Sequence, residues 1–145
     1  VNIIHILFLR RIFMSKFSLK LKKIVLLLFL LLFLFYVVLF LNTNSVMRYA
    51  KAVFRGEIAL EEVADSPLYR HYYPKNEPDL DKVDLNLYRT FVLHNFSDGY
   101  IWIKYDVAYI DSSGYEFSGS RNVPARWKIH KENGEWKVVE IKESP

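Results

Sequence analysis

Hydrophobic residues fill one long stretch of the chain without interruption, and periodic patterns follow it. Residues 24–41 read IVLLLFLLLFLFYVVLFL, 18 residues without a charge, a glycine or a proline. As a helix this stretch would rise roughly 27 Å, close to the bilayer's hydrocarbon thickness of about 30 Å. It lacks the polar face that a helix of a soluble domain normally carries. The pattern therefore predicts a membrane-spanning helix.

A cleaved signal peptide is the alternative interpretation of this stretch. The apolar core of a signal peptide usually has about 7–15 residues and is followed by small residues at the cleavage site. Here the run is longer, and Asn42, Thr43 and Asn44 come directly after it. We therefore favour an uncleaved anchor.

Apolar residues next recur at helical spacing in residues 46–64, namely at Val46, Ala50, Val53 and Phe54 and again at Ile58, Leu60 and Val63. This pattern predicts an amphipathic helix. Gly56 interrupts it, so we expect either a kink or two short helices. Ser66-Pro67 is expected to end the helical region.

Residues 68–83 are the least regular part and hold two prolines, three tyrosines and His71. We expect a loop with at most one helical turn. Loops carry function more often than cores do, so this segment is a candidate contact surface. The favoured alternative is a linker whose tyrosines pack on the sheet.

The period changes to two from Leu85 onward, which predicts strands. Residues 85–95 and 100–111 flank Asp98-Gly99, a strong signal for a two-residue hairpin turn. That turn would place five pairs on one apolar face and Arg89 on the opposite face. The pairs are Phe96 with Ile101, His94 with Ile103, Val92 with Tyr105, Thr90 with Val107 and Tyr88 with Tyr109.

Two more strands are predicted, at residues 115–131 and 136–142. The first is interrupted at residues 119–124, and its proline indicates a bulge or bend.

Asn133-Gly134 between the strands allows two registers. A two-residue loop sets Glu132 opposite Glu135 and Trp127 opposite Glu140. A three-residue loop instead pairs opposite charges and apolar residues with each other, and we prefer it. Its pairs are Lys131 with Glu135, Arg126 with Glu140, Trp127 with Val139 and Ala125 with Ile141.

These elements predict an α+β fold. An N-terminal transmembrane helix is followed by an amphipathic helix packed on a curved four-stranded antiparallel meander. The expected parts are a basic cytoplasmic tail (1–23), the span (24–41) and an extracytoplasmic domain (42–145). Residues 14–16 read Met-Ser-Lys and resemble the start of a signal anchor, so we hypothesise that translation starts at Met14.

Charge is distributed unevenly along the chain, whose net charge is +4. Six basic residues and no acidic residue precede position 24, whereas residues 42–145 carry 14 basic and 16 acidic residues. The positive-inside rule therefore puts the N-terminus in the cytoplasm. A slightly acidic domain gives no reason to expect nucleic acid as a partner. Because the chain has no cysteine, neither a disulfide nor a thiolate metal site can form. Small secreted domains of eukaryotes often contain disulfides, so we favour a bacterial origin.

The final segment, ARWKIHKENGEWKVVEIKES (residues 125–144), resembles the last hairpin of the nuclear-transport-factor-two-like, or cystatin-like, superfamily. The resemblance implies helices followed by a curved antiparallel sheet. Members include membrane-anchored assembly modules, as in type IV secretion systems, small-ligand binders and a few isomerases or dehydratases. This chain has fewer predicted helices and strands than that fold, which implies a shallow pocket or none.

Candidate chemistry is sparse. His94 on the apolar face could serve as a general base, with Tyr105 and Tyr88 lining a ligand pocket, but a hydrogen-bonded core histidine is the commoner case. No metal-ligand spacing or cofactor motif is present. Asp79, Asp81 and Asp84 are spaced like part of a calcium loop, but the glycine and the closing glutamate of such a loop are missing. We therefore expect a non-enzymatic interaction or scaffold domain with a protein partner in or near the same membrane. The alternatives are a small-ligand-binding protein or an enzyme that uses His94.

Overall fold

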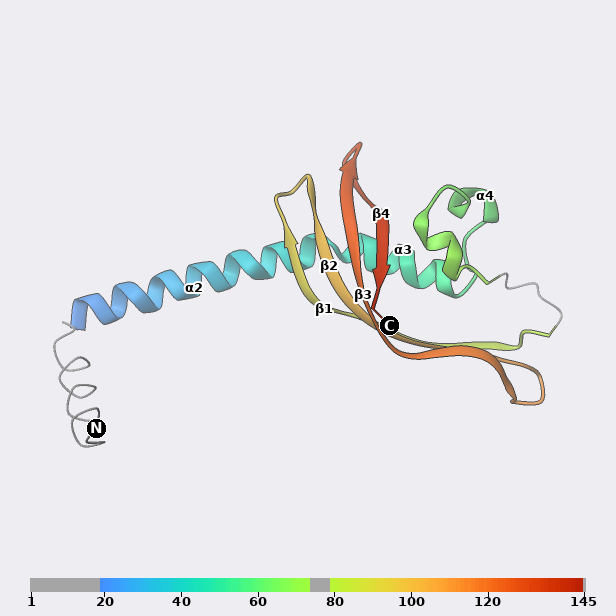
Figure 1. The fold of residues 1–145 in the computed structure, drawn as a ribbon. Helices are drawn as coiled ribbons and strands as arrows, with labels where there is room; N and C mark the ends of the chain where they lie inside the picture. Colours follow the sequence, from blue (N-terminus) through green and yellow to red (C-terminus); the bar gives the residue numbers. More distant parts are fainter. Residues whose placement is uncertain (1–18, 74–78, 145) are drawn as a thin grey trace, which may run out of the picture. The chain divides into compact units, whose positions relative to one another are not determined.

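The computed structural model describes residues 19–73 and 79–144 and divides the chain into two units, Val1–Val38 and Leu39–Pro145. The expectations for the basic tail before residue 19 and for Met14 lie outside the described residues. Helix α2, Leu19–Asn42, contains the predicted span (Figure 1). Among the described residues, one helical stretch, Leu19–Phe54, is long and apolar enough to cross a membrane, and α2 is its apolar part.

Gly56 separates two helices, as its position in the sequence predicts. Helix α3, Asn44–Phe54, ends in a Schellman motif in which Gly56 has a φ of 63° and the N–H groups of Gly56 and Glu57 donate to Val53 and Ala52. Helix α4, Leu60–Val63, follows. The α-helical region ends at Val63, before Ser66-Pro67, and the short 3₁₀ helix η1, Pro67–His71, is the single helical turn expected after it. The Ser66 hydroxyl caps η1 by accepting from the Leu68 N–H, and proline is favoured at a first helical position.

Four strands form one antiparallel sheet in the order β1-β2-β3-β4, which confirms the α+β meander. The strands are β1 (Lys82–His94), β2 (Asp98–Ile110), β3 (Glu116–Glu132) and β4 (Glu135–Glu143). They bend markedly along their length (Figure 1). The predicted interruption of β3 is a bulge, where the pairing shifts between Tyr105 and Val107 and Asn122 adopts a φ of 51°.

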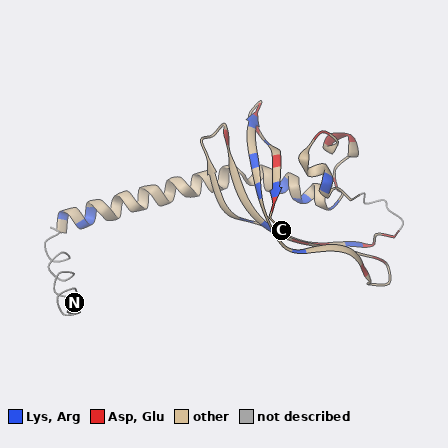
Figure 2. Cartoon of the chain, in the orientation of Figure 1, with Lys and Arg blue, Asp and Glu red and all other residues tan. Residues whose placement is uncertain are grey.

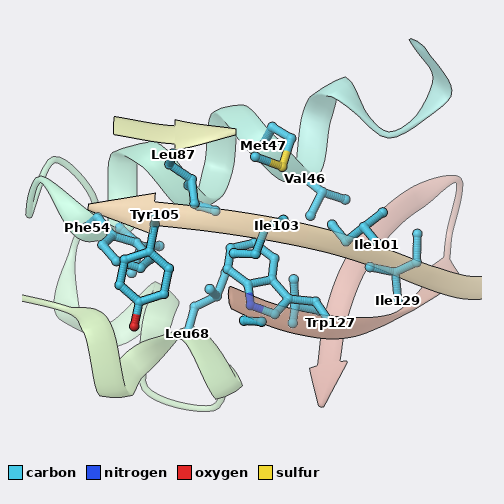
Figure 3. Packing of buried hydrophobic residues seen from close by; sticks show 14 of the residues in the cluster. Val46, Met47, Phe54, Leu68, Leu87, Ile101, Ile103, Tyr105, Trp127 and Ile129 are labelled. Atoms are coloured by element: carbon cyan, nitrogen blue, oxygen red, sulfur yellow. The ribbon is translucent and has the colours of Figure 1, made fainter. Parts of the chain in front are cut away.

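One face of the sheet is covered by α3 and η1, and the core lies between them. The four α3 residues predicted to face the sheet, Val46, Ala50, Val53 and Phe54, are all buried. They meet Ile101, Ile103 and Trp127 of the sheet, while Leu68 of η1 closes the other side (Figure 3). The amphipathic helix therefore covers the sheet as expected. Beyond η1, Tyr73 stacks on Tyr109 of β2 with ring centroids 4.5 Å apart, as a packed linker would.

The register predicted for the first hairpin is wrong. His94 pairs with Gly99 and Val92 with Ile101, and a bulge between Arg89 and Phe91 shifts the remaining pairs. The bulge keeps Val92 and His94 on the covered face but moves the alternation of all earlier residues by one. Arg89 therefore lies on the covered face rather than the opposite one. The predicted core residues Tyr88, Thr90 and Phe96 are exposed instead.

The conformation of Gly99 explains why Asp98-Gly99 does not form the predicted two-residue turn. This glycine has no positive φ, and the chain reverses over residues 95–98, where Phe96 has a φ of 70°. A Cβ atom added at Gly99 would lie 2.3 Å from Cβ of His94 and 2.4 Å from the Leu93 carbonyl oxygen. The glycine therefore permits a close approach of His94 rather than a tight turn.

The preferred register of the last hairpin is also wrong. Glu132 lies directly across from Glu135, and Asn133 and Gly134, with φ of 51° and 86°, form a two-residue turn. Lys137 binds the Glu132 carboxylate and relieves the repulsion between the two acids. A bulge beyond Ile129 places Trp127 opposite Ile141 instead of Glu140, so the unfavourable pairing does not arise.

Candidate functional site

His94 binds the end of the apolar helix. Its Nδ1 accepts a hydrogen bond from the Phe96 N–H at 3.0 Å, so the neutral ring carries its hydrogen on Nε2. Nε2 lies 2.9 Å from the Leu39 carbonyl oxygen, to which it donates. The ring packs against Trp136 at 4.8 Å between centroids, and the residue is only 8% exposed. Both ring nitrogens are therefore used inside the fold.

Arg89 and Trp136 bind the next residues of the same helix end. Arg89 Nη1 donates to the Phe40 carbonyl at 2.5 Å and to Oγ1 of Thr43 at 2.6 Å, and its guanidinium lies 4.1 Å from the centre of the Phe40 ring. The Trp136 indole N–H donates to Oδ1 of Asn42 at 2.7 Å. We call Arg89, His94 and Trp136, with the helix residues they bind, the junction cluster.

The last carbonyls of a helix have no partner within that helix and need one elsewhere when water is excluded. Arg89 and His94 of β1 supply these partners for Phe40 and Leu39, and Trp136 of β4 binds the Asn42 side chain. Leu39, Phe40 and Asn42 thus belong to the folded unit, which begins at Leu39. Sequence reasoning missed Arg89 because its place on the covered face depends on the bulge beside it.

A second polar cluster surrounds Tyr105 further along the sheet. The Tyr105 hydroxyl donates to Oε1 of Glu143 at 2.8 Å, and Arg70 Nη2 donates to Oε2 at the same distance. His71 Nε2 lies 3.3 Å from Oε1 without forming a hydrogen bond, and its ring stacks on Phe54 at 4.6 Å. We call Arg70, His71, Tyr105 and Glu143 the Glu143 cluster.

Burial controls proton affinity in the Glu143 cluster. It lowers the pKa of His71 to about 4, although the nearby Glu143 carboxylate opposes this change. Burial, followed by the hydrogen bond to Glu143, raises the pKa of Tyr105. At neutral pH His71 is therefore uncharged and the Tyr105 hydroxyl is a hydrogen-bond donor. No local signal in the sequence links Tyr105 to Glu143, because the sheet register brings them together.

The three residues proposed for a ligand pocket lie apart. His94 pairs with Gly99 of β2. Tyr105, which pairs with Leu87, lies six residues beyond Gly99 on β2, so His94 and Tyr105 are roughly 20 Å apart. Tyr88 faces the opposite side of the sheet and is 45% exposed. The structure therefore does not assemble His94, Tyr105 and Tyr88 into one site.

A groove lies beside β4, one of the two edge strands of the sheet. It has a volume of about 680 Å³ and is bordered by α3, by residues 62–67 and by residues 135–139 of β4. Glu62, Asp65 and Glu135 contribute three carboxylates, while its lysine, Lys137, is bound to Glu132. Acidic residues cluster on the α4 segment (Figure 2). The groove thus combines aromatic walls, Tyr49 and Trp136, with negative charge.

Within residues 19–73 and 79–144, no group of three or more His, Asp or Glu side chains lies close enough together to hold a metal ion. Comparison with protein-family models, curated proteins and solved structures finds no match to this chain.

Proposed function

We propose that this chain is a single-pass membrane protein whose domain, on the outer side of the membrane, binds a protein partner in or near the same membrane without catalysing a reaction. The junction cluster carries this proposal, because it makes the last turn of the apolar helix part of the folded domain. A domain built onto its anchor stays next to the membrane surface. Its reach is therefore limited to partners found there.

Charge at the start of the anchor supports this orientation. Lys20, Lys22 and Lys23 lie in the first turns of α2, and further basic residues precede them in the sequence. Cytoplasmic flanks carry such an excess of Lys and Arg. The domain after the span is slightly acidic, as the rule allows for the outer side.

The orientation can be tested directly because the chain has no cysteine. A single Ser113→Cys variant places a thiol in the exposed turn between β2 and β3, and Ser15→Cys places one before the span. We expect a membrane-impermeant maleimide to label Ser113→Cys on intact cells and Ser15→Cys only after lysis. The reverse pattern would overturn the orientation and leave the fold unaffected.

The groove beside β4 is the surface we assign to the partner. Its three carboxylates favour a segment that carries Lys or Arg, and its aromatic walls favour apolar side chains beside that charge. Aromatic residues in a concave site are typical of protein contacts. The partner is therefore expected to present a short apolar and basic segment close to the membrane.

Site-specific crosslinking tests this assignment. A photoreactive amino acid at Val139 in the groove should give a discrete crosslinked product in native membranes, whereas one at Tyr115 should not. The variant Glu62→Lys/Asp65→Lys should reduce this product. Asp81→Lys/Asp84→Lys makes the same charge change at exposed positions outside the groove and should leave it unchanged. Equal crosslinking at both positions would contradict the assignment.

We further propose that the domain is a reduced relative of the nuclear-transport-factor-two-like, or cystatin-like, superfamily. A helix packed on a curved antiparallel meander and the Trp-containing final hairpin support this relationship. Its small-ligand and enzymatic members suggest the alternative that His94 acts on a ligand. That alternative is less favoured because both ring nitrogens of His94 already have partners in the fold.

A further inference from the structure

The face of the sheet opposite the core carries a row of aromatic residues that are exposed or half-buried. Phe91 and Trp102 have ring centroids 5.2 Å apart, and Tyr100 lies 6.1 Å from Trp102. Leu93 extends the row toward the end of β1 and is 55% exposed, while Phe91 is 45% exposed. Exposed apolar residues that adjoin each other usually mark an interaction site.

This row ends at the turn between β1 and β2, next to the membrane anchor. Phe96 at the turn is 42% exposed, and its backbone N–H binds the same His94 ring that binds the Leu39 carbonyl. Leu39 lies two residues before the end of the apolar run at Leu41. Through His94, the turn is thus attached to the last turn of the anchor, where the chain must leave the bilayer.

Positive charge accompanies the aromatic row. The Arg126 guanidinium lies 5.1 Å from the centre of the Tyr100 ring, and Lys128 lines a surface hollow with Leu93 and Tyr100. The carboxylate of that hollow, Asp98, is bound to His130 at 2.7 Å. Lysine and arginine beside tryptophan and tyrosine match the headgroup layer, where aromatic rings meet the apolar boundary and cations meet phosphate.

We infer that this surface rests on the lipid headgroups around the anchor. We call it the lipid-facing surface, and it comprises Phe91, Leu93, Phe96, Tyr100, Trp102, Arg126 and Lys128. Its occupant is a bilayer, because the attachment of His94 to Leu39 places a bilayer beside it whenever the apolar helix is inserted. The inference rests on the proposed membrane anchoring and adds a second contact with the same membrane. The groove beside β4 is left free for the protein partner.

Depth-dependent quenching of a fluorophore tests this inference on the full chain. Single-cysteine variants Leu93→Cys and Phe96→Cys would each carry an environment-sensitive dye, with Tyr115→Cys, 67% exposed, as the matched control. The protein is reconstituted into phosphatidylcholine vesicles with about one third phosphatidylglycerol and brominated lipid chains. We expect quenching at positions 93 and 96 to exceed that at 115 by about threefold, because only side chains at the headgroup boundary approach the brominated chains.

Equal quenching at all three positions would overturn the inference. So would protection of positions 93 and 96 that disappears on dilution of the protein in the bilayer, because a second copy of the chain would then cover the surface. Vesicle quenching does not depend on which side of a cell membrane the domain occupies. A negative result here is therefore distinguishable from a failure of the maleimide test of orientation.

A charge variant supplies an independent measurement. Arg126→Glu/Lys128→Glu should lower quenching at Phe96→Cys in the anionic vesicles by about half, because each basic residue near such a surface contributes favourably. In vesicles of phosphatidylcholine alone the same variant should behave like the parent chain. Lys82→Glu/Arg121→Glu makes the same charge change at exposed positions outside the surface and should have no effect in either vesicle. A loss of quenching by both variants would contradict the role of Arg126 and Lys128.

Discussion

His94, which is buried, and His71, which is partly buried, lie near different ends of the same sheet, and their surroundings differ. His94 has a hydrogen-bond partner for each ring nitrogen, and both partners are backbone groups. His71 stacks on Phe54, and its Nε2 lies 3.3 Å from a Glu143 oxygen without a hydrogen bond. The first ring therefore connects two pieces of backbone, whereas the second lies in a side-chain cluster whose charge depends on pH.

The difference shows that the same fold holds one histidine through backbone groups and the other among charged side chains. At the junction cluster the bound groups are helix carbonyls and amide oxygens, which do not titrate near neutral pH. At the Glu143 cluster, a carboxylate, a histidine and an arginine lie together, so protonation changes the balance of charge. We therefore expect acid to weaken the domain around the Glu143 cluster.

The largest expected effect is that of His94→Ala. This change removes two hydrogen bonds, leaves the Leu39 carbonyl and the Phe96 N–H without their partner and opens a cavity beside Trp136. It should lower the free energy of unfolding by about 3 kcal/mol. Urea unfolding of the full chain in detergent micelles, followed by tryptophan fluorescence, measures the effect. The control His130→Ala changes a half-exposed histidine paired with Asp98 and should cost about 0.5 kcal/mol or less. Similar losses in both variants would contradict the structural role of the His94 hydrogen bonds.

The pH dependence of stability should come next in size. Burial lowers the pKa of His71 from 6.5 to about 4 in the folded domain, so the unfolded chain takes up the proton first as the pH falls. The free energy of unfolding should therefore decrease by about 2 kcal/mol between pH 6.5 and pH 4 and be fully regained above pH 6.5. His71→Phe keeps the ring on Phe54 and should flatten this part of the profile. An unchanged slope in that variant would place the acid sensitivity elsewhere.

Tyr105→Phe should have a smaller effect. The change removes the hydroxyl that donates to Glu143, but Arg70 still binds the other carboxylate oxygen. A loss of about 1 kcal/mol is expected, the usual value for one partly buried hydrogen bond. Arg70→Ala breaks the more exposed ion pair of the same carboxylate and should cost less, about 0.5 kcal/mol. If the arginine variant lost more stability, charge rather than the hydroxyl would hold this end together. Urea midpoints of the two variants decide between these outcomes.

The smallest effect is expected for Lys137→Gln at the last hairpin. Lys137 relieves the repulsion between Glu132 and Glu135, but all three side chains are exposed, so the loss of stability should be small and confined to low salt. The difference from the parent chain should vanish at high salt because ions screen exposed charges. Thermal unfolding at two salt concentrations measures it. A loss that persists at high salt would show that Lys137 contributes by packing.

The sequence by itself determined the order and type of the elements. Unbroken hydrophobicity identified the apolar helix, helical spacing identified the buried face of α3, and Gly56 marked the end of that helix. Period-two alternation identified four strands in the right order. These features are local, because each depends on residues close together in the chain, and a propensity or a period is sufficient to find them.

Only the tertiary structure decided the registers and the polar clusters. The bulge beside Arg89 and the bulge beyond Ile129 each shift by one position the pairs that lie farther from the hairpin turn. No local sequence pattern predicts these bulges. Gly99 shows the limit most clearly, because its dipeptide signals a tight turn while its actual role is to let His94 come close. The contacts of His94 with Leu39 and of Tyr105 with Glu143 depend on how the strands curve around α3. Long-range packing therefore determines which side chains meet, and local patterns in the sequence do not predict these contacts.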